Sequence, residues 1–126
     1  VHSVRDSLTG EILQQSVPEG VSLGISASTM QLIRDGMYAC AQEQGGSAYN
    51  SFADYTATTV CAKTGTAEYA SELPTALLVG YAPAEDPEIA FVVVVEHSGT
   101  SVTRYLASLV KEVLNYYFSS QAQTAG

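Results

Sequence analysis

Basic residues are scarce in this sequence. Only five Lys and Arg face 13 Asp and Glu, which gives a formal charge of −8. The five are scattered along the chain, at Arg5, Arg34, Lys63, Arg104 and Lys111. Because a protein that follows a phosphate backbone needs clustered cations, the sequence argues against nucleic acid as a partner.

Long apolar runs are also missing. The longest, Ile89 to Val95, is strand-sized and falls well short of the roughly 20 residues that cross a bilayer. We therefore expect no membrane span in this chain. The chain also begins without an initiator Met or a signal peptide, so we interpret its first residue as a boundary set by the design of the expressed chain or by cleavage.

Cysteine and histidine are too few for a metal centre. Cys40 and Cys61 lack metal-ligand spacing, and His2 and His97 lie far from them in sequence. The sequence thus predicts no metal and no cofactor, and ordinary surface or strand-end histidines. Buried, reduced thiols are the first expectation, and a Cys40–Cys61 disulfide is the alternative that an oxidising compartment permits.

Apolar residues make up 46% of the 126 positions, which is enough for one compact unit. Residues 1–25 predict a hairpin and a connection, with Gly10 at the turn. Residues 26–46 predict a helix capped by Ser26 or Ser28 and ended by glycines, in which Gly36 indicates close local packing. Residues 47–55 are polar and small, and predict a surface loop.

An antiparallel sheet is predicted over residues 56–97. Its first strand begins in the β-branched run 56–60 and continues through Lys63, and the apolar runs 76–82 and 89–95 complete a three-stranded meander. Residues 101–118 carry the apolar stripe of a helix that lies across one sheet face, and residues 119–126 predict a frayed tail. The fold class is therefore α+β, with one domain over residues 1–126.

The segment Lys63-Thr64-Gly65-Thr66-Ala67 has poor composition for the interior of a strand. Alternation places Lys63 and Gly65 on one side and Thr64 and Thr66 on the other. On a strand that borders a cleft, the segment would present an ammonium, two hydroxyls and unpaired N–H groups, and Gly65 would let a ligand approach the backbone. This pattern suits an anionic ligand, whereas a surface lysine beside a bulge glycine is the alternative for the bare tripeptide.

The surrounding sequence resembles the transpeptidase family of penicillin-binding proteins, in which Lys-Thr-Gly is a signature. The likeness covers nearly the whole chain, although Ser47 stands where the family usually has Thr and Cys61 where it commonly has a small residue. The segments that carry the likeness, in chain order, are Met30 to Met37, Gly46-Ser47-Ala48, Ala62 to Glu68, Val79 to Pro83 and Asp86 to Ala90.

The resemblance implies the C-terminal portion of a β-lactamase/transpeptidase-like fold. It implies acyl transfer, in which a serine attacks a D-alanyl-D-alanine stem peptide of peptidoglycan, and acylation by β-lactam antibiotics. In this implied site Lys63 supplies positive potential, the Thr64 and Thr66 hydroxyls with Gly65 between them bind the terminal carboxylate, and the Thr66 backbone N–H is an oxyanion-hole donor. The implied location is the extracytoplasmic face of the bacterial membrane, with the parent anchored by a segment outside this chain.

The family's nucleophile motif and its Ser-x-Asn motif do not precede Lys63. Ser108-x-x-Lys111 matches the first motif formally, but it follows Lys63 and lies on the polar face of the last helix, so we interpret it as coincidence. We expect this chain alone to be inactive, because it lacks a nucleophile and base. The upstream half would be a separate chain packed against this one, or a segment removed by design or proteolysis. A serine β-lactamase or a β-lactam sensor of the same fold is the alternative parent.

Overall fold

The computed structural model describes residues 3–17, 19–68, 70, 72–98 and 102–124. The elements along the chain are β1 (Ser3–Arg5), β2 (Ile12–Gln15), α1 (Ala27–Gln42), α2 (Tyr49–Phe52), β3 (Cys61–Ala67), β4 (Thr75–Ala82), β5 (Ile89–Val95) and α3 (Thr103–Thr124). Two antiparallel sheets and a long C-terminal helix confirm the predicted α+β class.

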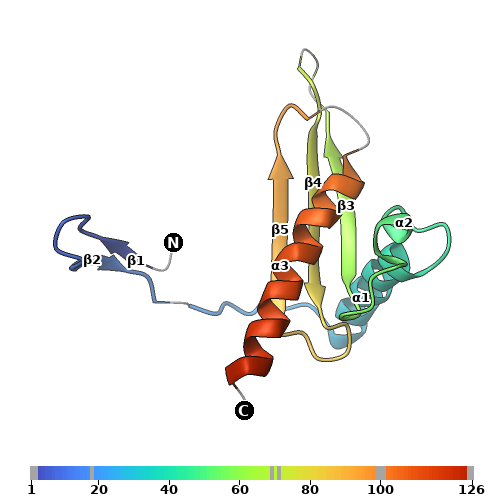
Figure 1. Ribbon diagram of the computed structural model, residues 1–126. Coiled ribbons are helices and arrows are strands. Elements are labelled where there is room, and N and C mark those ends of the chain that lie inside the picture. Colours follow the sequence, from blue (N-terminus) through green and yellow to red (C-terminus); the bar gives the residue numbers. More distant parts are fainter. Residues whose placement is uncertain (1–2, 18, 69, 71, 99–101, 125–126) are drawn as a thin grey trace.

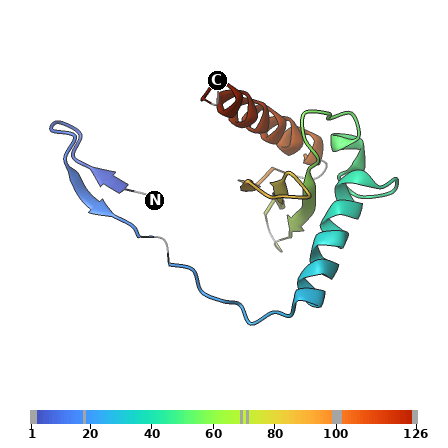
Figure 2. The same ribbon diagram turned by 90° about the horizontal axis from the view of Figure 1, so that it is seen from below.

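The predicted N-terminal hairpin is confirmed as β1 and β2. Its turn is held by the carboxylate of Asp6, which accepts hydrogen bonds of 2.8 Å from the backbone N–H groups of Leu8 and Thr9. These bonds lower the pKa of Asp6, with the N–H of Thr9 as the largest cause. The hairpin lies apart from the rest of the molecule, at the end of an extended connection (Figures 1 and 2).

The predicted meander is confirmed as a sheet of order β3-β4-β5, which leaves β3 and β5 at its two edges. Its first strand starts later than expected, however, because β3 begins at Cys61 and residues 56–60 are irregular. Cys61 pairs with Tyr81, so a strand extended backwards would meet Ala82 and then Pro83, which has no N–H to donate. The carbonyl of Val60 is instead bonded by the Gln42 side-chain amide, at 2.7 Å.

The C-terminal helix α3 crosses one face of the sheet, as predicted (Figure 1). Its buried positions Leu106, Val110 and Leu114 recur every fourth residue and pack in one cluster with Leu78 of β4. The prediction of a frayed tail from residue 119 is wrong, because helix α3 continues to Thr124. The hydroxyls of Ser119 and Ser120 donate to carbonyls one turn earlier, so these polar residues are accommodated within the helix.

Helix α1 begins as predicted, with the Ser26 side chain accepting from the N–H of Thr29 at 3.1 Å. It ends at Gln42, four residues before the predicted end. Gly46 follows in a tight return, where a Cβ would overlap the carbonyl oxygens of Ala39 and Cys40. The space around Gly36 is open, so the close packing expected there is absent from the described residues.

The segment predicted as a surface loop, 47–55, contains the short helix α2. Phe52 is the reason, because its ring is 1% exposed and belongs to the core cluster that α3 also enters. Lys111 of α3 lies over this ring, with Nζ 5.9 Å from its centroid. One buried aromatic side chain thus converts a polar segment into a packed turn of helix.

Two glycines provide a matched test of this packing. A Cβ at Gly80 would overlap both the carbonyl of Cys61 and the ring of Phe91, so we expect Gly80→Ala to destabilise the fold by about 1–3 kcal/mol. A Cβ at Gly36 meets nothing within 4 Å, so we expect Gly36→Ala in mid-helix to stabilise it by about 0.5–1 kcal/mol. Urea denaturation followed by circular dichroism measures both, and equal effects of the two variants would contradict this account.

Candidate functional site

The segment Lys63 to Ala67 lies on β3, at the open edge of the three-stranded sheet. In Figure 1, β3 runs on the side of the sheet nearest to α1 and α2. β4 occupies its other edge through an unbroken antiparallel register, from Cys61↔Tyr81 to Ala67↔Thr75. The strand is therefore paired on one side only, and the backbone groups that face away from β4 are open to other partners.

Two contacts show which way the backbone of Thr64 faces. Its carbonyl accepts a 2.8 Å bond from Nζ of Lys63, and its N–H is on the side of Cys40 of α1, where it helps to lower the pKa of that thiol. Both groups therefore point away from β4. Because N–H and C=O directions repeat every second residue in an antiparallel strand, the N–H of Thr66 points the same way.

Thr66 differs from Thr64 in having no partner on this open edge among the residues that the structure describes. Outside the β3–β4 ladder, no other described residue is hydrogen-bonded to its backbone or to its hydroxyl. Lys63 and Thr66 are exposed, and Thr64 and Gly65 between them are half-buried. A Cβ at Gly65 would touch only the side chain of Leu77, at 3.4 Å, so the fold itself does not require a glycine here.

A chain of polar side chains connects the end of α1 to this strand. The hydroxyls of Ser47 and Thr64 are 2.7 Å apart, and the hydroxyl of Ser47 is 3.2 Å from the sulfur of Cys40. Burial raises the pKa of the Cys40 thiol, but the hydrogen bonds from Ser47, Thr64 and Ala48 and the charge of Lys63 together lower it. In the sequence, Ser47 stands out only as part of a segment that resembles the family, and no pattern predicts its contact with Thr64. The one available signal is that this segment and the Lys-Thr-Gly segment occur in the same chain.

The two cysteines are buried and free, which agrees with the first expectation rather than with the disulfide. Cys61 has different surroundings, because it lies opposite Tyr81 in the β3–β4 register. Burial raises the pKa of the Cys61 thiol. Burial and the bond to Cys61 raise the pKa of Tyr81 to about 12. Cys61 therefore belongs to the packing of β3 on β4, whereas Cys40 contacts the candidate site.

In the formal Ser-x-x-Lys sequence, each of the two side chains is hydrogen-bonded to another group. Nζ of Lys111 is 2.7 Å from a carboxylate oxygen of Asp54, and the hydroxyl of Ser108 donates to the carbonyl of Arg104. Of the histidines, His97 lies 3.4 Å from Glu72, and His2 is outside the described residues.

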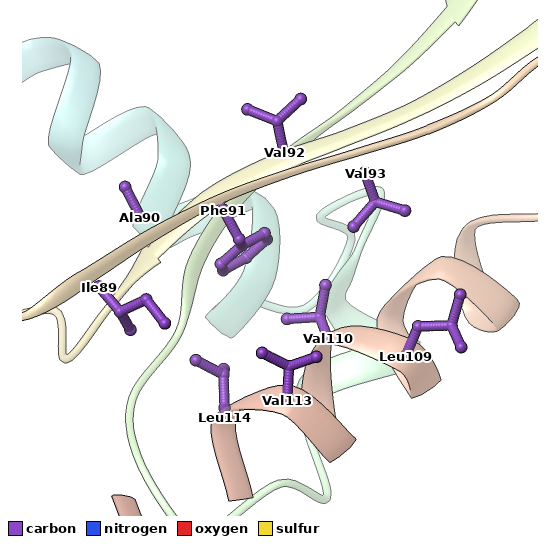
Figure 3. Close-up of a pocket in the computed structure, with 9 residues that line it drawn as sticks. All are labelled: Ile89, Ala90, Phe91, Val92, Val93, Leu109, Val110, Val113 and Leu114. Carbon is purple, nitrogen blue, oxygen red and sulfur yellow. The ribbon is translucent and has the colours of Figure 1, made fainter. Parts of the chain in front are cut away.

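An apolar hollow of about 340 Å³ lies away from Lys63, between β5 and α3. Figure 3 shows side chains from both elements facing into it, including Phe91, Val93, Val110 and Leu114. The described residues that line it offer no ammonium or hydroxyl group, so it does not suit a carboxylate ligand. Val92 and Val94, on the same edge strand, are 66% and 51% exposed.

The residues that the structure describes contain no cluster of His, Cys, Asp and Glu that could hold a metal ion. No helix among them has the length and apolar character needed to span a bilayer.

Comparisons with known proteins agree with the resemblance. A family model described as "Penicillin binding protein transpeptidase domain" matches residues 1–116. Penicillin-binding protein 2B of Streptococcus pneumoniae (strain R6) is 30% identical over 114 residues, which are 86% of this chain and 17% of the relative. The chain thus spans about a sixth of the length of the curated relatives that it matches.

Solved structures give the same result. The structure of penicillin-binding protein 2B from S. pneumoniae R6 has a TM-score of 0.69 and 27% identity, covering 88% of this chain and 19% of that one. The D,D-transpeptidase domain of a peptidoglycan glycosyltransferase from Eggerthella lenta has a TM-score of 0.64 and 28% identity, covering 95% and 27%. This chain belongs to the transpeptidase domain family of the penicillin-binding proteins.

Proposed function

We propose that this chain is the substrate-binding, C-terminal portion of a serine D,D-transpeptidase that cross-links peptidoglycan stem peptides and is acylated by β-lactams. The observation that carries the proposal is the open edge of β3. There the backbone N–H of Thr66, to which no described residue outside the β3–β4 ladder is hydrogen-bonded, lies beside two hydroxyls and an ammonium. Such a set fits an acyl donor that carries a carboxylate, which is the chemistry of both D-alanyl-D-alanine and a penicillin.

Each group of the segment has one proposed role. The ammonium of Lys63 provides positive potential, and the hydroxyls of Thr64 and Thr66 bind the terminal carboxylate. Gly65 leaves room for the ligand backbone beside the strand. The N–H of Thr66 stabilises the oxyanion that forms when the serine attacks, and one such donor is typically worth about 100- to 1000-fold in rate.

The nucleophile and its base would come from the upstream half of the domain, which we propose as the partner of this chain. The apolar surface supports this, because an uncovered edge strand as apolar as β5 is rare in isolated proteins. The β5–α3 hollow in Figure 3 is one place where such a partner could pack. The membrane anchor and the extracytoplasmic location belong to the same proposal for the parent.

The role of Thr66 is tested by two substitutions in the parent protein. Thr66→Pro removes the N–H but no ladder bond, because that group faces away from β4; we expect acylation by a fluorescent penicillin to slow about 100- to 1000-fold. Thr66→Val keeps the N–H and removes the hydroxyl, so we expect a loss of about 10-fold. Stopped-flow or gel fluorescence measures both rates. If the acylation rate fell equally in the two variants, the N–H of Thr66 would have no role in stabilising the oxyanion.

The fate of the acyl-enzyme separates the transpeptidase from the alternatives. We expect the parent to retain a penicilloyl adduct for hours, and this chain alone to acquire none, because it has no nucleophile. Intact mass spectrometry over time measures both. Release of the hydrolysed drug within minutes would identify a β-lactamase, and a stable adduct without cross-linking of stem peptides would identify a sensor. Labelling of a serine in this chain alone would contradict its predicted inactivity.

A further inference from the structure

We propose that Ser47 is a positioning residue for the substrate carboxylate: its hydroxyl holds the hydroxyl of Thr64 in place and sets the direction in which that hydroxyl donates. This inference rests on the proposed function of β3. Ser47 itself touches no ligand in this account, and it acts through Thr64.

The geometry of the connection between α1 and β3 places Ser47 where it can do this. The turn after α1 passes through Gly46, where any side chain would overlap the carbonyls of Ala39 and Cys40. The N–H of Ala48 then bonds the carbonyl of Cys40 at 3.0 Å, so Ser47 is fixed between two backbone constraints. Its hydroxyl lies 2.7 Å from Thr64, which is 17 residues away in the sequence.

The chain of side chains runs from Cys40 through Ser47 to Thr64. The sulfur of Cys40 lies 3.2 Å from the hydroxyl of Ser47, and either atom can donate; in this proposal the thiol is the donor. Ser47 would then donate to the Oγ1 of Thr64, 2.7 Å away, at a contact where either hydroxyl can be the donor. No other described residue is hydrogen-bonded to this hydroxyl, so its own hydrogen is available to a carboxylate at the open edge.

A threonine without this support would have to be ordered by the ligand. Its hydroxyl could rotate toward water or toward the backbone, and binding would then include the cost of fixing it. Ser47 would therefore affect only how tightly the carboxylate is bound. Its substitution should lower ligand affinity and leave the acylation rate at saturation unchanged, because other groups hold the carbonyl that is attacked.

The test compares benzylpenicillin with its methyl ester, which lacks the carboxylate, in the parent protein. We expect Ser47→Ala to weaken binding of the acid roughly 5-fold, with the saturating acylation rate within about twofold and the ester unaffected. Ser47→Thr and Ser47→Val form a matched pair of nearly equal shape, and only Thr should keep the affinity for the acid. Cys40→Ser, which keeps a donor, should resemble the wild type, and Cys40→Ala should lose part of the effect. Rapid-quench kinetics give the binding constant and the rate separately.

Several outcomes would overturn the inference. If acid and ester weaken equally in Ser47→Ala, Ser47 supports the fold and not the carboxylate. If Ser47→Ala does not fold, the Thr and Val variants decide, and equal affinities of the two for the acid would contradict the role. If the wild-type parent is not acylated by benzylpenicillin at all, the proposed function fails and this inference fails with it. Acylation of the wild type with an unchanged acid-to-ester ratio in every variant would leave the proposed function standing and remove only the role of Ser47.

Discussion

The candidate site depends on β3 being paired on one side only. Seven consecutive pairs with β4 fix its position and its direction, from Cys61↔Tyr81 to Ala67↔Thr75. On the other side, the turn after α1 meets the strand at Thr64, whose hydroxyl lies 2.7 Å from that of Ser47, and outside the β3–β4 ladder no described residue is hydrogen-bonded to Thr66. The strand is therefore rigid where it carries its functional groups and open where a ligand would add, which is the arrangement that extended peptides use when they bind a sheet edge.

The rest of the structure serves to hold that edge in place. α3 covers one face of the sheet through Leu106, Val110 and Leu114, and Phe52 of α2 joins the same core. Gly80 allows β4 to approach both Cys61 and the ring of Phe91 closely. Binding groups that must meet a ligand within a fraction of an ångström need such a scaffold, because a loose strand would lose the benefit of fixed dipoles.

The few basic residues of this acidic chain include one lysine at the candidate site. In a chain with 13 acidic and five basic residues, one of two lysines stands on the open strand and the other forms an ion pair with Asp54. The apolar residues, in contrast, are numerous, and many of them are exposed on β5, on α1 and in the connection after the hairpin. Exposed apolar surface of this kind is typical of regions that pack against a partner.

The sequence by itself determined the class of fold and the strand that carries the motif. Alternation, helical periodicity and capping are local properties of the sequence, so the apolar strand at 89–95 and the helix cap at Ser26 could be predicted from it. The Lys-Thr-Gly segment could be identified from the sequence in the same way. Three features could not be predicted from the sequence. The start of β3 depends on Pro83 opposite the strand, and the helix in 47–55 depends on the burial of Phe52. The length of α3 depends on hydrogen bonds within its last turns. Only the tertiary structure decided that Ser47 meets Thr64 and that the N–H of Thr66 faces outward, because both follow from how α1 and β4 flank one strand, and no local pattern encodes that.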